Sequence, residues 1–230
     1  MVEYLRQLDI FDPIKQGYKL VVFGAGSLGS FITLNLAKMG FNQIMVWDYD
    51  KVDDVNIPNQ FYKLKDIGRY KVDALKDIVK EFTDVDIEIK NEKFISRTEL
   101  PMELNIIYIL TFDSLKNRRL VFEKLKDMNC ICMDVRAGGE EFNIQVVKTS
   151  NYNEMKKWDD SFNITPTELP CSAKSIIYTN LNIASEVCNI VKKINNDERY
   201  PTKLLRNMKG YVIINDFNKL KKEVKEDDGD

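Results

Sequence analysis

Apolar and polar residues along this chain follow two periods, one typical of strands and one typical of helices. Short apolar runs predict strands at residues 19–23, 43–48, 86–94, 105–111 and 130–135. Between them, helical spacing predicts helices at 30–39 and 115–128, and a third that opens at Gly68 with Val72, Leu75, Val79 and Phe82 on its buried face. The order β-α-β-α-β-β-α-β predicts an α/β fold with a doubly wound, mainly parallel sheet.

The pattern changes after Gly139. It predicts an antiparallel strand at 142–148, a long amphipathic helix at 176–194 and a last strand at 211–217, whereas 150–172 is polar and poorly periodic. We therefore expect residues 1–218 to form a single domain, in which antiparallel strands and a C-terminal helix extend the parallel sheet. Residues 219–230 are expected to form a charged, flexible tail.

The composition narrows the classes of function that the chain could have. The chain has 230 residues, 44% of them hydrophobic, and a net charge of −2. Acidic and basic residues are interspersed, which argues against nucleic acid as a partner. Apolar runs fall short of the roughly eighteen residues of a membrane span, and the N-terminus does not resemble a secretory signal. The four cysteines, Cys130, Cys132, Cys171 and Cys188, form no disulfide framework, so we expect a cytoplasmic protein.

The chain contains no histidine. This excludes mechanisms that need a Ser-His or Cys-His couple, and it excludes a histidine-ligated metal site. Reactions in which cations stabilise developing charge remain open, because they need no histidine for proton transfer.

Residues 24–29, GAGSLG, follow a predicted strand and precede a predicted helix, as in a Rossmann-like nucleotide site. Gly24 permits the tight turn, Gly26 lets the backbone approach a phosphate, and Gly29 lets the helix pack closely. Asp48 ends the next strand, where a carboxylate can accept hydrogen bonds from ribose hydroxyls. The motif predicts a nucleotide ligand but leaves NAD, FAD and ATP open.

The residues beyond this motif resemble the ThiF/MoeB family, whose adenylating domain is shared with ubiquitin-activating enzymes. The family's D-x-D-x-V, N-L-x-R-Q and G-x-x-K stretches correspond to residues 48–52 (DYDKV), 56–60 (NIPNQ) and 68–71 (GRYK). Upstream, LRQLDIF looks like the family's R-Q-I opening, and downstream, LTFDSLKNRR looks like its D-x-x-x-x-R strand end. The resemblance covers roughly residues 4–145.

This resemblance implies a homodimeric, ATP- and Mg²⁺-dependent adenylyltransferase. Its substrate would be the C-terminal glycine of a ubiquitin-like or sulfur-carrier protein. Lys71 would reach the ATP phosphates, Asp113 would hold Mg²⁺, and Arg6 would enter the partner subunit's nucleotide site. The motifs also place Asp50, Asn56, Asn59, Gln60 and Arg118 at the nucleotide. Structural alternatives are a surface position for Lys71 and an N-cap role for Asp113.

The chain departs from the family at Asn59, where the family has an arginine that contacts the phosphates. Reduced activity, or a non-catalytic nucleotide-binding or dimerisation module, is therefore an alternative. An NAD-dependent oxidoreductase is a further alternative, supported by the glycine motif alone. Cys171, in a polar segment before a predicted helix, is a candidate thioester nucleophile. The sequence leaves open whether Arg136 binds a substrate or pairs with Asp134.

Overall fold

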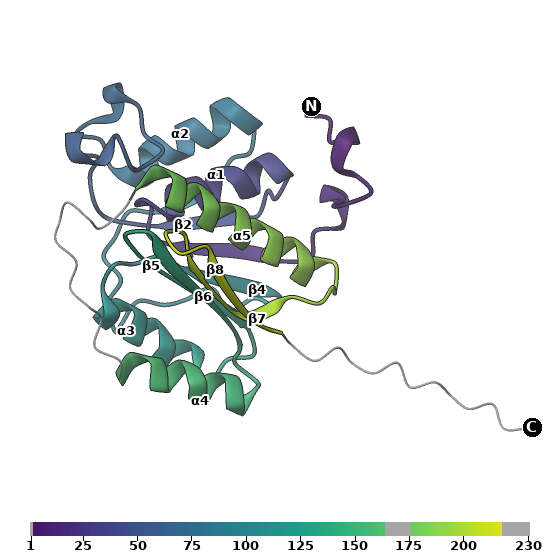
Figure 1. Cartoon of the computed structure of the whole chain (residues 1–230). Helices are drawn as coiled ribbons and strands as arrows, with labels where there is room; N and C mark the ends of the chain where they lie inside the picture. Colours follow the sequence, from purple (N-terminus) through teal and green to yellow (C-terminus); the bar gives the residue numbers. More distant parts are fainter. Residues whose placement is uncertain (1, 164–175, 218–230) are drawn as a thin grey trace, which may run out of the picture.

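The computed structural model describes residues 2–163 and 176–217, and Figure 1 shows a sheet with helices on both faces. The strands are β1 Lys19–Phe23, β2 Ile44–Trp47, β3 Glu88–Lys90, β4 Ile106–Leu110, β5 Ile131–Gly138, β6 Glu141–Lys148, β7 Pro201–Asn207 and β8 Val212–Phe217. The helices are α1 Gly29–Met39, α2 Lys71–Thr83, α3 Leu115–Leu125, α4 Tyr152–Asp160 and α5 Ile177–Asn195. Short 3₁₀ turns occur at Leu5–Gln7, Pro13–Lys15, Asp54–Asn56, Leu64–Asp66 and Ser161–Asn163.

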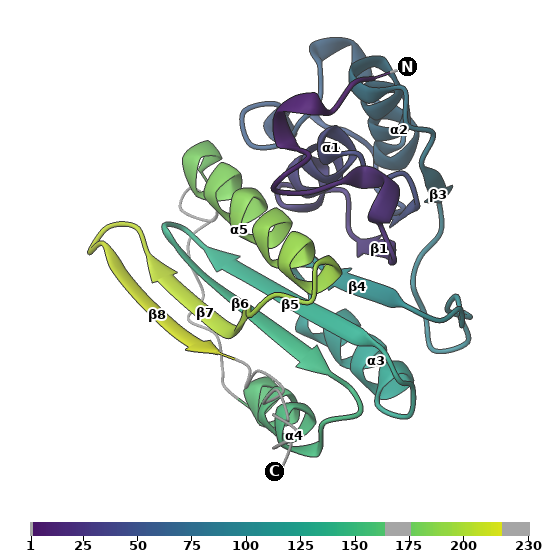
Figure 2. The ribbon, with the colours of Figure 1, turned by 90° about the vertical axis from the view of Figure 1, so that its right-hand side faces the viewer.

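The strands of the described residues form one sheet in the order β3-β2-β1-β4-β5-β6-β7-β8. Neighbours from β3 to β5 are parallel, whereas β5 to β8 are joined by antiparallel pairs. Figure 2 shows this antiparallel half extending the sheet beside α5. The expected α/β fold, with a parallel core and antiparallel extension, is confirmed.

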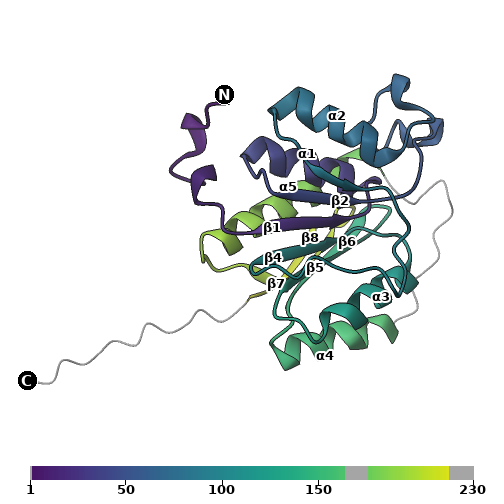
Figure 3. The ribbon, with the colours of Figure 1, turned by 180° about the vertical axis from the view of Figure 1, so that it is seen from behind.

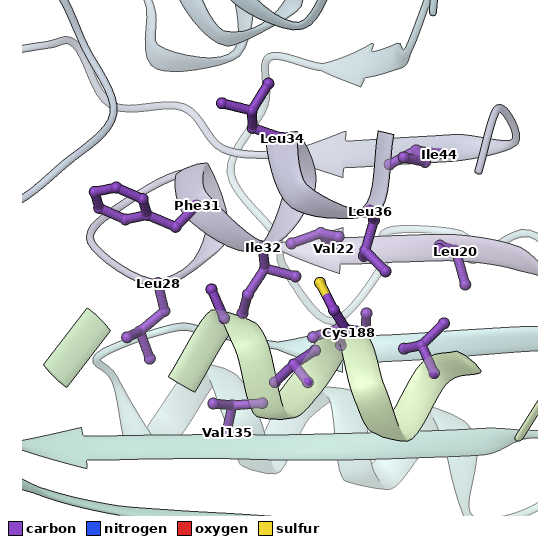
Figure 4. Close-up of a cluster of buried hydrophobic side chains, with 14 of the residues drawn as sticks. Leu20, Val22, Leu28, Phe31, Ile32, Leu34, Leu36, Ile44, Val135 and Cys188 are labelled. Atoms are coloured by element: carbon purple, nitrogen blue, oxygen red, sulfur yellow. The ribbon is translucent and has the colours of Figure 1, made fainter. Parts of the chain in front are cut away.

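Two hydrophobic layers hold the sheet, because the central strands are buried on both faces. Leu20 and Val22 of β1 point toward α1 and α5, whereas Val21 and Phe23 join the cluster with α3 and α4. Figure 4 shows Val22 beside Ile32 of α1, with Leu20 further along the strand past Leu36, and both above the α5 helix. Figure 3 shows the opposite side of the molecule, where α3 and α4 lie together beneath the sheet.

Two elements were not predicted. Residues 152–160, in the poorly periodic segment, form α4, which begins where Asn151 Oδ1 accepts from the backbone N–H groups of Asn153 and Glu154. Only Met155 and Trp158 of this helix are buried, too few for a clear helical period. Strand β7 was missed because its segment, PTKLLRN, has two adjacent apolar residues between polar ones and so shows no alternation of apolar and polar positions.

The observed ends of α2 and β3 differ from the predicted ends, because loop residues lie at these positions. The helix expected to open at Gly68 begins at Lys71, because residues 51 and 70 first form an isolated antiparallel bridge. Phe82 was expected on its buried face but is 49% exposed, and its ring packs against Phe61 of the preceding loop, 5.9 Å away. The strand expected at 86–94 is paired only at 88–90, which leaves 91–94 to turn toward the carboxyl ends of the neighbouring strands.

The chain reverses its winding between β1 and β4, which lie side by side although α1, β2, α2 and β3 separate them in sequence. Ligands of open α/β sheets bind outside the carboxyl ends of strands at such a point. In the ranges that the structure covers, none of the helices combines the length and the apolar character needed to cross a membrane.

Candidate functional site

A cavity of about 200 Å³ opens at the carboxyl ends of β1, β2 and β4. Its wall is made by the glycine turn after β1, the loop after β2, the first residue of α2 and the turn from β4 into α3. The amino ends of α1, α2 and α3 therefore border one space. Backbone N–H groups and the positive ends of the helix dipoles favour an anion there.

Each of the three motif positions takes glycine for a different structural reason. Gly24 has a φ of +102°, a left-handed conformation that favours glycine. A Cβ on Gly29 would lie 1.8 Å from Gly24 O, so only glycine lets α1 begin so close to the turn. A Cβ on Gly26 would meet no heavy atom within 4 Å, which leaves an open cradle against the backbone at the cavity wall.

Two hydroxyl groups that the sequence did not single out hold this turn in place. Thr111 Oγ1 lies 2.7 Å from Phe23 O and 3.1 Å from Gly24 O. The buried Tyr62 hydroxyl lies 2.6 Å from Ala25 O and 3.4 Å from Lys71 O, so it connects the glycine turn with the start of α2. Neither residue shows a recognisable motif, because each role depends on contacts with distant segments.

Asp48, Asp50 and Lys71 form the side of the cavity next to β2 and α2. Asp48 accepts hydrogen bonds from the backbone N–H groups of Ala25 and Asp50, both at 2.7 Å. Burial raises the pKa of the Asp48 carboxyl, opposed by these donors and by the Lys71 charge. Lys71 is 8% exposed, and its Nζ lies 3.3 Å from Asp50 Oδ2. The alternative of a solvated surface lysine is therefore wrong.

Asp113 lines the opposite side of the cavity and is exposed to solvent. The N-cap of α3 is the next residue, Ser114, whose Oγ accepts from the Asn117 N–H. Within the described residues, the Asp113 carboxylate makes no hydrogen bond or ion pair. It is therefore available to a ligand, and the alternative of an N-cap role does not apply.

The loop after β2 brings only part of its motif to the cavity. Gln60 lines the cavity, and its Oε1 is buried without a hydrogen-bond partner among the described residues. Asn56 instead closes a capping box by accepting from the Asp53 N–H. Asn59 is not among the cavity-lining residues, and its backbone oxygen accepts from the Asn180 amide at 3.1 Å.

Two arginines expected at the nucleotide lie outside this cavity. Arg118 is 4% exposed, and its guanidinium is bonded to Asp134 and to three backbone carbonyls. Arg6 is exposed on the turn Leu5–Gln7, beside the carboxyl end of α1, where Gln7 Nε2 donates to Met39 O. Since α1 spans roughly 16 Å, the turn Leu5–Gln7 and the glycine turn lie at opposite ends of it.

The charges at the cavity constrain its ligand. Among the described lining residues, Asp48, Asp50, Glu92 and Asp113 oppose Lys71, four carboxylates against one lysine, a net charge of −3. A triphosphate would be repelled at this charge unless cations accompanied it. No cluster of three metal-binding side chains occurs in the described ranges. Mg²⁺ is commonly held by one or two carboxylates together with substrate phosphates, and Asp113 suits that arrangement.

The glycine cradle and the unpartnered Gln60 oxygen likewise fit a nucleotide.

Of the thiols, Cys171 lies outside the described residues. Burial raises the pKa of Cys132 and Cys188, the latter to about 12, as expected of core cysteines. Arg136 pairs with Asp134 and also lines a groove beside α4.

Comparisons with known proteins found a matching family model and related sequences. A sequence model of the ThiF family matches residues 10–227. Ubiquitin-like modifier-activating enzyme 5 of Caenorhabditis elegans is 31% identical over 100 residues, 43% of this chain and 21% of that protein. The NEDD8-activating enzyme E1 catalytic subunit of Arabidopsis thaliana is 30% identical over 114 residues, 48% of this chain and 25% of that protein. The chain thus spans a quarter or less of these relatives' length.

Solved structures share the fold at low sequence identity. PaaA has a TM-score of 0.69 and 19% identity, and the match covers 89% of this chain and 73% of that chain. E. coli MccB, solved with ATP, has a TM-score of 0.68 and 13% identity, covering 88% of this chain and 65% of that chain. MccB was also solved with AMPCPP and MccA, where the TM-score is 0.66.

Proposed function

Because the chain belongs to the ThiF family, we propose that it is an ATP-dependent adenylyltransferase. Its substrate would be the carboxylate at the C-terminal glycine of a ubiquitin-like or sulfur-carrier protein. In the proposed reaction, a carboxylate oxygen attacks the α-phosphorus of ATP. The bond from that phosphorus to the pyrophosphate oxygen breaks, so an acyl-adenylate and pyrophosphate form. The names of three relatives, which are enzymes that activate a ubiquitin-like modifier, NEDD8 and SUMO, support this substrate class.

One observation carries the proposal: Lys71 and Asp113 face one cavity from opposite sides of the open turn at Gly26. The backbone at Gly26 and the amino end of α1 would bind the phosphates, and Asp48 would accept from the ribose. Asp113 would hold Mg²⁺, which when bound would supply positive charge beside the leaving phosphates. Lys71 would add a second positive charge there, and no proton transfer from a histidine is required.

A groove supports an extended peptide as the carboxylate donor. It has a volume of about 930 Å³, lies beside α4 on β6 and β7, and reaches Leu115, two residues beyond Asp113. Asn143 and Gln145 of β6 face it, and Asn143 Oδ1 is buried without a partner in the described part of the chain. An extended chain terminus offers backbone N–H groups to such an acceptor, and its carboxylate would lie toward the nucleotide.

The net negative charge of the cavity supports a second subunit. Arg6 lies too far along α1 to reach its own glycine turn, and it makes no ion pair in the described residues. We therefore include in the proposal a homodimer in which Arg6 enters the partner's site, where a guanidinium can pair with phosphate oxygens. It would supply the cation that Asn59 does not. A cytoplasmic location completes the proposal.

Nucleotide binding tests the proposal directly. Isothermal titration should show that ATP with Mg²⁺ binds, and that NAD does not. A thermal shift should agree, since a ligand at a hundred times its dissociation constant stabilises by about 2.7 kcal/mol. Binding of NAD in place of ATP would overturn the adenylyltransferase proposal.

A second candidate function is a non-catalytic nucleotide-binding or dimerisation module, which the uncharged Asn59 favours. It binds ATP as well, so binding cannot separate the two. ATP–pyrophosphate exchange can, when it is measured with candidate small proteins that end in Gly-Gly. Exchange supports the enzyme, and ATP binding without exchange across the tested carriers supports the module.

A further inference from the structure

Arg118 occupies a buried position directly beneath the turn that carries Asp113. Its guanidinium donates to Leu110 O at 3.1 Å, to Val135 O at 2.8 Å and to Phe112 O. It also forms an ion pair with Asp134. The guanidinium therefore holds the last residue of β4, the residue just before Asp113, and strand β5 in one arrangement.

Asp134 is itself firmly placed. It is 1% exposed, and its Oδ2 accepts from Arg136 Nε at 2.9 Å and Nη2 at 2.6 Å, and from Trp158 Nε1 at 2.9 Å. Burial by itself would raise the pKa of this carboxyl, but the charges of Arg118 and Arg136 outweigh it and the pKa is lowered. Asp134 is thus ionised near neutral pH and provides a fixed anchor for Arg118.

The residues on either side of Asp113 are held by hydrogen bonds, whereas the Asp113 side chain is not. Thr111 Oγ1 ties its start to the glycine turn, and Ser114 caps the helix that follows. Arg118 bonds the Phe112 carbonyl between them. Since the Asp113 side chain has no partner of its own among the described residues, the backbone contacts of its neighbours decide where the carboxylate points.

We infer that Arg118 is a positioning residue, which holds the Asp113 carboxylate where it can ligate the metal of the bound nucleotide. This rests on the proposed function, because it presumes that ATP and a divalent cation occupy the cavity. Arg118 acts through Phe112 and does not touch the nucleotide. Groups that orient metal ligands in this way affect metal affinity by about 10- to 100-fold.

The number and direction of the hydrogen bonds at position 118 require an arginine. The planar guanidinium offers several donors in a fixed fork, and here they reach three carbonyls and a carboxylate. A lysine keeps the charge next to Asp134 but presents its donors from a single atom. Arg118→Lys should therefore preserve the ion pair and release the Phe112 carbonyl.

The test measures how much Mg²⁺ strengthens ATP binding. Dissociation constants for ATP are determined with Mg²⁺ and with EDTA, for the wild type, Arg118→Lys, Asp113→Asn and the double variant. Arg118→Lys should reduce the strengthening by Mg²⁺ about tenfold and leave binding in EDTA unchanged. Asp113→Asn should also reduce it, and the double variant should match Asp113→Asn, because both substitutions act on the same ligand.

The control is Arg119→Lys, the same substitution one position further along α3. Arg119 pairs with Glu123 and Asp159 and has no hydrogen bond to the Asp113 turn, so its Mg²⁺ effect should equal that of the wild type. If Arg118→Lys does not fold, Arg118→Gln serves the same comparison, because it leaves the Asp134 carboxylate paired with Arg136.

The outcomes separate the two proposals. If the wild type does not bind ATP, the proposed function fails. If it binds ATP with a Mg²⁺ effect that Arg118→Lys leaves intact, the positioning role of Arg118 fails alone. It also fails if Arg118→Lys weakens binding equally with and without Mg²⁺, or if its effect persists in the Asp113→Asn background.

Discussion

Adding one methyl group at Gly26 should separate nucleotide binding from folding. The Cβ of Gly26→Ala would meet no heavy atom within 4 Å, and the φ of this residue is outside the left-handed region. The folded protein can therefore accept alanine without strain. Loss of backbone freedom in the unfolded chain should leave stability unchanged or raise it by about 0.4–1 kcal/mol.

The same methyl group should weaken ATP binding because it fills the space where a phosphate would approach the backbone. A hydrogen bond to a charged group contributes about 1.5–3 kcal/mol. Losing one such contact corresponds to roughly 10- to 150-fold weaker binding, at about 1.4 kcal/mol for each factor of ten. Isothermal titration with ATP and Mg²⁺ gives the affinity, and thermal unfolding gives the stability.

Two other glycines provide controls. A Cβ on Gly17 also meets nothing within 4 Å, but Gly17 lies outside the cavity, so Gly17→Ala should bind ATP normally. A Cβ on Gly29 would lie 1.8 Å from Gly24 O, so Gly29→Ala should destabilise the fold by about 1–3 kcal/mol or more. Normal ATP affinity in a stable Gly26→Ala protein would refute the assignment of the phosphates to this turn.

Three further predictions concern charged residues. Asp113→Ala should leave the melting temperature unchanged, because this carboxylate has no partner in the described residues, and should lower pyrophosphate exchange by roughly two orders of magnitude; unaltered exchange would refute its role. Arg6→Ala should abolish pyrophosphate exchange without changing the dimer seen by sedimentation. Mixing Arg6→Ala subunits with Asp113→Ala subunits should restore the exchange activity. An inactive mixture, or a wild-type protein that sediments as a monomer, would exclude a shared site. Because the pKa of Asp134 is lowered in the folded state, its stabilisation is present above the ordinary value of 3.8 and is lost as the pH falls below it. Asp134→Asn should flatten the acid limb of the melting-temperature profile, and an unchanged profile would show that this pair does not contribute.

Features that depend on neighbours in the chain were accessible from the sequence. Strand β1 was predicted at its observed bounds, because a short apolar run ending in glycine predicts a buried strand without further information. The glycine turn followed from the same local pattern. The resemblance to the ThiF/MoeB family also identified Lys71 and Asp113, because the motifs that contain them are local stretches of sequence, and both residues line the cavity.

Other features depend on contacts between segments far apart in the chain. The period of α4 is weak in sequence, and this helix is held by the burial of Trp158, whose indole reaches Asp134 of β5. Tyr62 shows no motif, yet its hydroxyl joins the glycine turn to α2. Such roles could not be predicted because a hydrogen bond between distant segments leaves no periodic pattern.

The residues of the Asp113 motif illustrate the same division. The sequence alone determined that Asp113 follows a buried strand and that Arg118 lies in the first turns of the next helix. Only the tertiary structure decided that Ser114 caps this helix, leaving Asp113 available, and that Arg118 points inward to Asp134. The physical reason is that local spacing sets which helix face a side chain occupies. Whether that face meets solvent, a ligand or a buried carboxylate depends on the strand packed against it, which here is β5.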